Sequence, residues 1–140
     1  MDARVNVSTA LGLSDGDAHI IRNAGGVITE DVIRSLVISQ RLLGTREIML
    51  IHHTDCGMEN LSEDHFRDEL TSHAGVRPDF SIGSFADVET AVQSAVRAVR
   101  ACRFLSDASS VRGFIYDVPT HAIVEIDVAR RTPARHRATT

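Results

Sequence analysis

The hydrophobic positions of the chain follow a helical period in two segments. In residues 29–44 the apolar side chains recur three or four positions apart, and Thr29 suits the N-cap while Gly44 suits the C-terminal stop. Residues 84–105 show the same spacing and begin at Ser84, which can cap a helix, and residues 62–73 lie between a Ser62 cap and an end near Gly75. The sequence therefore predicts a helix in each of these three segments.

Shorter runs between these segments are typical of strands. Residues 18–22 form a β-rich run closed by a glycine turn, and residues 47–51 form an apolar run that we expect to be buried on both faces. Residues 112–118 and 122–128 flank the turn Pro119-Thr120-His121. This order predicts an α/β fold: a mostly parallel sheet flanked by helices, with an antiparallel edge strand near the C-terminus.

Length and composition limit the possible classes of protein. A chain of 140 residues is expected to form one domain, here residues 1–129, followed by a flexible basic tail over residues 130–140. The formal net charge of −4 argues against a nucleic-acid partner. No apolar run approaches the roughly 20 residues of a membrane span. The chain shows no secretory leader, and its two cysteines fit a reducing compartment, so we expect a cytoplasmic protein.

Two polar clusters follow predicted strands, at the edge of an α/β sheet where ligands bind. They are Arg22-Asn23-Ala24-Gly25-Gly26 and His53-x-x-Cys56-Gly57. The imidazole and the thiolate of the second cluster can reach one zinc ion. A cysteine in such a pair can equally be a small buried side chain, so a third ligand is needed to decide. Asp2 is a candidate, because a carboxylate can bind zinc or orient another ligand.

Together these motifs resemble one family. Asp2-x-Arg4, Arg22-Asn23-Ala24-Gly25, the helix from Thr29 and His53-x-x-Cys56-Gly57 are similar in order and spacing to the β-class carbonic anhydrases, especially the short microbial type. The resemblance implies a zinc-dependent lyase that converts carbon dioxide reversibly to bicarbonate. It also implies a homodimer or a dimer of dimers, because the sites of the family lie at a dimer interface.

The resemblance also implies roles for individual residues. His53 and Cys56 match the second and third zinc ligands of the family, and Asp2 and Arg4 match its aspartate–arginine pair. In that pair the arginine holds the carboxylate away from the metal, which leaves the fourth position to water. The positions expected to line the pocket are Asn23, Ala24, Gly25 and Gly57.

The first zinc ligand of the family pattern Cys-x-Asp-x-Arg would stand immediately before Met1. Three explanations are open: the chain is a fragment that lacks the N-terminal arm, the first strand and this cysteine; it is a homologue with an impaired site; or Asp2 completes a site with His53, Cys56 and water. We favour the first. Alternative functions are a zinc-poor binding or regulatory protein, and a hydrolase of a carbon dioxide analogue such as carbonyl sulfide or carbon disulfide.

Neighbouring residues are expected to have ordinary structural roles. We expect His52 to pack or to face solvent, and Asp55 to be an exposed loop residue. Arg22 is expected to pair with Asp31 or with a partner chain, and a functional role for it is the open alternative. Cys102 falls inside the predicted helix 84–105, far from the motifs, and is not expected to bind metal.

Overall fold

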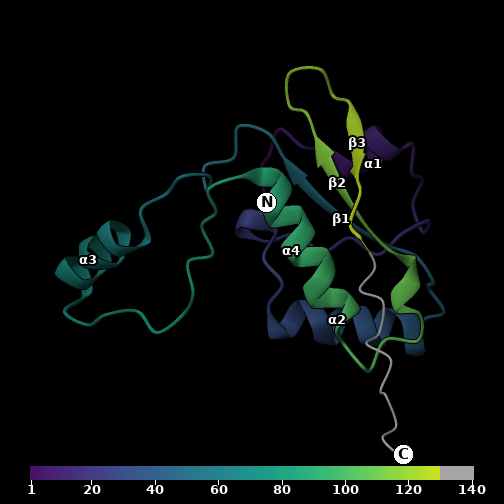
Figure 1. Cartoon of the computed structure of the whole chain (residues 1–140), viewed down its shortest axis with the longest axis horizontal. Helices are drawn as coiled ribbons and strands as arrows, with labels where there is room; N and C mark the ends of the chain where they lie inside the picture. The colour runs from purple at the N-terminus through teal and green to yellow at the C-terminus, as the bar shows by residue number, and fades with distance from the viewer. Residues whose placement is uncertain (130–140) are drawn as a thin grey trace, which may run out of the picture.

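Three strands form a mixed sheet in the order β1-β2-β3. The computed structural model describes residues 1–129, so the predicted basic tail lies outside the described residues (Figure 1). Strand β1 (Ile48–His53) runs parallel to β2 (Val111–Tyr116), and β3 (Ile123–Ile126) pairs antiparallel with β2 at the edge. The structure thus confirms the predicted α/β class and its antiparallel edge strand.

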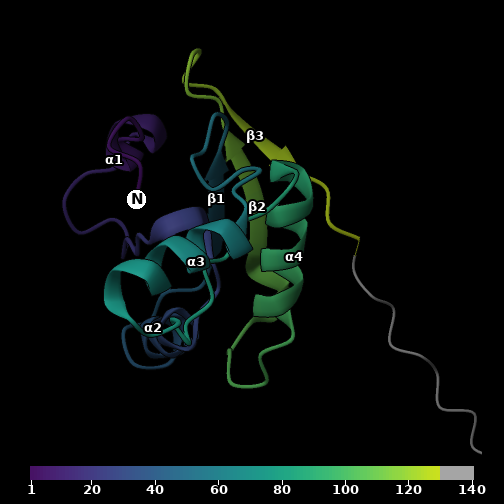
Figure 2. The same ribbon diagram turned by 90° about the vertical axis from the view of Figure 1, so that its left-hand side faces the viewer.

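Helices cover and flank this sheet. The remaining elements are α1 (Val7–Leu11), η1 (Ala24–Gly26), α2 (Glu30–Arg41), α3 (Glu63–Ala74), α4 (Val88–Arg100) and η2 (Ala108–Ser110). Helix α4 runs along the sheet, whereas α3 projects away from it on long connections (Figures 1 and 2). No helix within residues 1–129 is long and apolar enough to cross a membrane.

The core lies between α4 and the sheet. Val92, Val96 and Val99 of α4 are fully buried, and they cluster with Ile48 of β1 and Val111 of β2. The close approach depends on Gly113 in β2, because a Cβ there would lie 2.4 Å from Val92 Cγ1 and 2.8 Å from Val96 Cγ2. The absence of a side chain at this one strand position therefore sets how closely the helix packs.

The predicted helices exist, with different ends for two of them. Thr29 caps α2 and Ser62 caps α3, as expected, but α2 ends at Arg41, before Gly44. Helix α4 begins later than predicted because Ser84 donates from its backbone N–H and its hydroxyl to Glu63 Oε1, at 2.9 and 3.1 Å. Asp87 caps the helix instead, accepting from the backbone N–H of Thr90 at 2.7 Å.

Helix α4 also ends earlier than predicted, at Arg100, so Cys102 follows the helix instead of lying inside it. The Cys102 side chain is half-buried and packs against the core cluster. The side chain of Cys102 therefore contributes to the packing around α4.

The strand predicted over residues 18–22 is wrong. These residues are in no strand, and Ile20 and Ile21 are 47% and 45% exposed. Strand β1 is the sheet edge on that side within the described residues, and it is not buried on both faces, since Met49 is 40% exposed. A β-rich sequence forms a strand only where a neighbouring strand accepts its hydrogen bonds, and here none does.

Candidate functional site

Asp2 and Arg4 form a closely bonded pair. The Arg4 guanidinium donates from Nε to Asp2 Oδ1 at 3.0 Å and from Nη2 to Oδ2 at 2.6 Å, and the Arg4 backbone N–H donates to Oδ1 at 2.8 Å. These bonds hold the pKa of the Asp2 carboxyl well below its usual range. The carboxylate is therefore ionised and fixed in direction at neutral pH.

Arg4 also reaches the loop that follows β1. Its Nη1 donates to Asp55 Oδ2 at 2.6 Å, and its Nη2 donates to the Asp55 backbone carbonyl at 2.9 Å. Asp55 has a left-handed φ of 54°, and its side chain is 77% exposed. The expected exposure of Asp55 is confirmed, but the residue also joins the aspartate–arginine pair to the end of the central strand.

His53 ends β1 with one ring nitrogen engaged and the other directed toward the pair. Its Nδ1 lies 2.9 Å from the Thr54 backbone carbonyl. A carbonyl only accepts, so this contact favours the tautomer with its proton on Nδ1, in which Nε2 carries the lone pair. The Nε2 atom lies 3.9 Å from Asp2 Oδ2, and the ring is 14% exposed. Of the ring nitrogens, Nε2 is therefore the one suited to bind a metal.

Cys56 is a free, half-buried thiol in the turn that follows, where its backbone carbonyl accepts from the N–H of Glu59 at 3.0 Å. An imidazole and a thiol are donors that zinc prefers. Within residues 1–129, however, no group of three or more His, Cys, Asp and Glu side chains is placed to hold a metal ion. Both Asp2 oxygens already accept from Arg4. The described residues thus fit part of a zinc site and do not complete one.

The loop over residues 22–26 packs against the end of β1. Asn23 Nδ2 donates to the Val27 carbonyl at 2.8 Å, which holds the turn. Gly26 has a φ of 64°, and a Cβ there would lie 2.9 Å from His52 Nε2. A Cβ on Gly25 would lie 3.3 Å from Met58 Cγ, just beyond Cys56. The pocket roles of Asn23, Ala24, Gly25 and Gly57 stay predictions.

His52 packs in the interior, which was one of the two expected alternatives. Its ring is 7% exposed and lies 5.9 Å from the Phe85 ring, between centroids. Neither ring nitrogen has a hydrogen-bond partner among the described residues. Burial lowers the pKa of His52, and the nearby backbone of Gly26 offsets this only in part. His52 is thus a neutral packing residue beside His53.

The contacts of Arg22 differ from the expected pairing with Asp31. Its Nη2 donates to the Asp2 carbonyl at 2.6 Å and its Nη1 to the Val5 carbonyl at 2.8 Å. The expected partner Asp31 instead lies 3.4 Å from Arg34. Both acceptors of Arg22 are backbone atoms, which have no characteristic side-chain pattern, so the sequence carries no signal for this contact.

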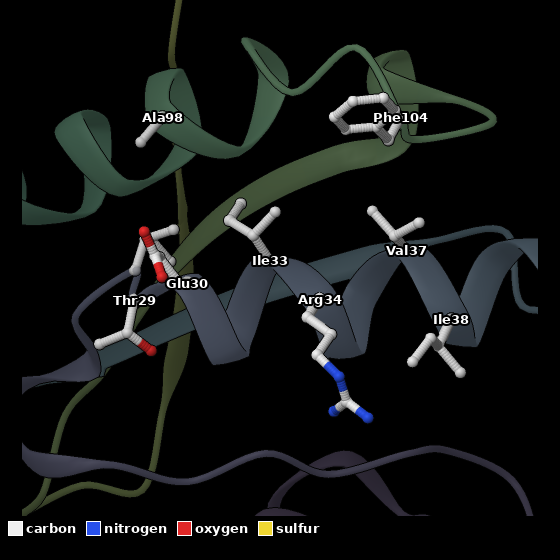
Figure 3. Close-up of a pocket in the computed structure, with 9 residues that line it drawn as sticks. Thr29, Glu30, Ile33, Arg34, Val37, Ile38, Ala98 and Phe104 are labelled. Atoms are coloured by element: carbon white, nitrogen blue, oxygen red, sulfur yellow. The ribbon is translucent and has the colours of Figure 1, made fainter.

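A separate apolar groove lies along α2. It has a volume of about 530 Å³ and is lined by Ile33, Val37 and Phe104 among others. Ile33 and Val37 point from α2 toward α4 and Phe104 (Figure 3). None of its lining residues belongs to the groups around Asp2, so the groove is distinct from the candidate site.

The fold and the site together describe an α/β protein with an arginine-held carboxylate beside a strand-end histidine. The carbonic anhydrase family model matches residues 1–76. Beta-carbonic anhydrase 1 of Mycobacterium tuberculosis is 48% identical over 126 residues, which are 90% of this chain and 77% of that protein. The carbon disulfide hydrolase of an Acidianus strain is 31% identical and matches 88% of this chain and 72% of its own length.

Solved structures agree with this similarity. The carbonic anhydrase of Streptococcus mutans superposes with a TM-score of 0.85 at 42% sequence identity, over 91% of this chain and 77% of that one. The chain belongs to the β-class carbonic anhydrase family. The resemblance that the motifs indicated is confirmed.

The contact between Gly26 and His52 can be tested by stability. We expect Gly26→Ala to destabilise the fold by about 2–4 kcal/mol, because a left-handed φ strains the new side chain and the added Cβ overlaps the His52 ring. The control is Gly44→Ala, whose φ of 77° carries the same strain but whose Cβ meets nothing within 4 Å. Urea unfolding should show a loss about 1–3 kcal/mol larger for Gly26→Ala; equal losses would contradict the contact.

Proposed function

We propose that the chain catalyses the reversible hydration of carbon dioxide to bicarbonate. The observation that carries the proposal is the Asp2 carboxylate, held by Arg4 with its Oδ2 3.9 Å from His53 Nε2. This arrangement occurs in a chain that is 48% identical to beta-carbonic anhydrase 1 of Mycobacterium tuberculosis.

The proposed site uses a zinc ion. His53, through Nε2, and Cys56, as a thiolate, would be two of its ligands. Zinc, when bound, lowers the pKa of water and so provides a nucleophile at neutral pH. The Thr54 carbonyl fixes the His53 ring for this role, because it holds the proton on Nδ1.

Asp2 would act as an oriented acceptor beside the metal ligands. Arg4 binds both of its oxygens, so the carboxylate stays ionised and keeps a fixed orientation. It can then accept a hydrogen bond from a water molecule. Arg4 is in turn held by Asp55, so the carboxylate keeps its direction relative to the end of β1.

We further propose that the chain forms a homodimer or a dimer of dimers. Light scattering of the purified chain can measure its oligomeric state.

Carbon disulfide hydrolysis is the second candidate, favoured by the similarity to the Acidianus enzyme. The sequence identity to this enzyme is 31%, against 48% to beta-carbonic anhydrase 1, so we propose carbon dioxide as the substrate ahead of carbon disulfide. Both reactions can be measured on one preparation, by stopped-flow acidification for carbon dioxide and by sulfide release for carbon disulfide.

The central experiment determines zinc content and hydration rate in the purified chain. We expect stoichiometric zinc by mass spectrometry, and acidification faster than in buffer alone. A preparation with neither metal nor activity would support the non-catalytic alternative and overturn the proposal. Zinc with sulfide release but no acidification would favour the second candidate.

Cys56→Ser is expected to abolish zinc retention, because a serine hydroxyl is a much poorer zinc ligand than a thiolate. The chain offers a matched control in Cys102→Ser, since this half-buried cysteine packs against the core and is outside the site. Metal analysis after gel filtration should find zinc in the control and none in Cys56→Ser. Equal zinc in both variants would remove Cys56 from the ligand set.

Arg4→Ala is expected to leave zinc in place and to lower kcat about 10- to 100-fold, because Asp2 loses the group that orients it. Arg34→Ala serves as the control, since this arginine is 69% exposed and its Nη1 pairs with Asp31 Oδ1 at 3.4 Å on the surface of α2. Stopped-flow kinetics with parallel metal analysis make the comparison. An unchanged kcat in a zinc-loaded Arg4→Ala protein would rule out the orienting role.

A further inference from the structure

Arg22 reaches from the segment before η1 to the backbone that carries Asp2 and Arg4. Its two terminal nitrogens donate to two carbonyls of that backbone, those of Asp2 and Val5, at 2.6 and 2.8 Å. A planar guanidinium presents its donors in a rigid fork, so the two bonds together fix both the position and the angle of the segment.

Arg4, which lies in this segment, makes a second set of contacts. The Arg4 guanidinium binds the Asp2 side chain and also the side chain and carbonyl of Asp55, after β1. Arg4 therefore sets the direction of the carboxylate. Arg22 contacts the Asp2 main chain instead, so it fixes the position of the backbone that carries the carboxylate.

Arg22 itself is joined to a well-packed part of the molecule. The next residue, Asn23, bonds across the turn to the Val27 carbonyl at 2.8 Å. Gly26, at the end of the turn, lies against the His52 ring, next to His53. A continuous set of contacts thus runs from the Asp2 carbonyl through Arg22 and the turn to the end of β1.

We propose that Arg22 is a positioning residue that places the Asp2 carboxylate relative to His53 Nε2. It acts through the Asp2 backbone and does not touch the reacting molecules. This inference rests on the proposed function insofar as the position of Asp2 matters for hydration, but the contact itself can be measured without any turnover.

The first test measures the backbone directly. The Val5 N–H donates to the Asp2 carbonyl at 3.2 Å, and the Arg4 N–H donates to Asp2 Oδ1, so both amides report on the order of this segment. In Arg22→Met, which keeps most of the side-chain length and loses the donors, we expect NMR solvent exchange of both amides to be about five- to tenfold faster. Arg22→Lys, with a single ammonium in place of the fork, should fall between wild type and Arg22→Met.

Arg34→Met is the matched control, because it removes an exposed arginine from α2 without touching residues 2–5. Exchange in this variant should equal that of wild type. Unchanged exchange in Arg22→Met would overturn the inference, whatever the activity of the protein. If Arg22→Met fails to fold, Arg22→Lys provides the comparison, and wild-type exchange in it would count against the fork.

The second test separates positioning from a general loss of structure. Arg22→Met should lower kcat for hydration about tenfold with KM unchanged, and it should have no further effect in an Asp2→Asn background, because it acts through Asp2. Additive losses in the double variant would overturn the positioning role. An inactive wild type with faster exchange in Arg22→Met would refute the proposed function and leave the Arg22 contact established.

Discussion

The arrangement of the site depends on how one guanidinium is shared. Arg4 divides its donors between the Asp2 carboxylate and the side chain and carbonyl of Asp55, so it links two segments that are 51 residues apart. The Arg4 side chain is 45% exposed, and exposed ion pairs contribute little to folding free energy. The main effect of this network is on the site geometry, because it keeps the Asp2 carboxylate ionised, oriented and close to His53.

The loops around this network pack closely because their backbones carry little bulk. Gly26 lies where a Cβ would overlap the His52 ring, and Gly25 lies close to Met58 in the loop after Cys56. Gly113 has the same effect in the core, where it allows α4 to approach β2. The sheet and the site are thus connected through His52 and His53, which occupy adjacent positions on β1 with opposite roles. One ring is buried without hydrogen-bond partners in the described chain, and the other faces the carboxylate.

The ends of the elements show which local signals compete with tertiary contacts. Ser62 and Thr29 cap their helices as the sequence predicts, and their hydroxyls accept from the backbone N–H groups of His65 and Val32. Ser84 has the same capping ability, yet its hydroxyl donates to Glu63 from another helix, and α4 begins after Asp87 instead. Residues 18–22 have strand-like composition, but they form no strand, and Ile20 and Ile21 are exposed.

The sequence alone predicted the α/β class, a hairpin of residues 112–118 and 122–128, the family, and the candidate side chains Asp2, Arg4, His53 and Cys56. These follow from local periodicity and from side-chain motifs, which are visible along the chain. Two contacts became visible in the folded structure alone. Arg4 donates to the Asp55 carboxylate, and Arg22 donates to the backbone carbonyls of Asp2 and Val5. Backbone carbonyls are the same at every position, so a side chain that binds them has no partner that a sequence pattern can identify. The folded backbone alone decides which carbonyls such a side chain reaches.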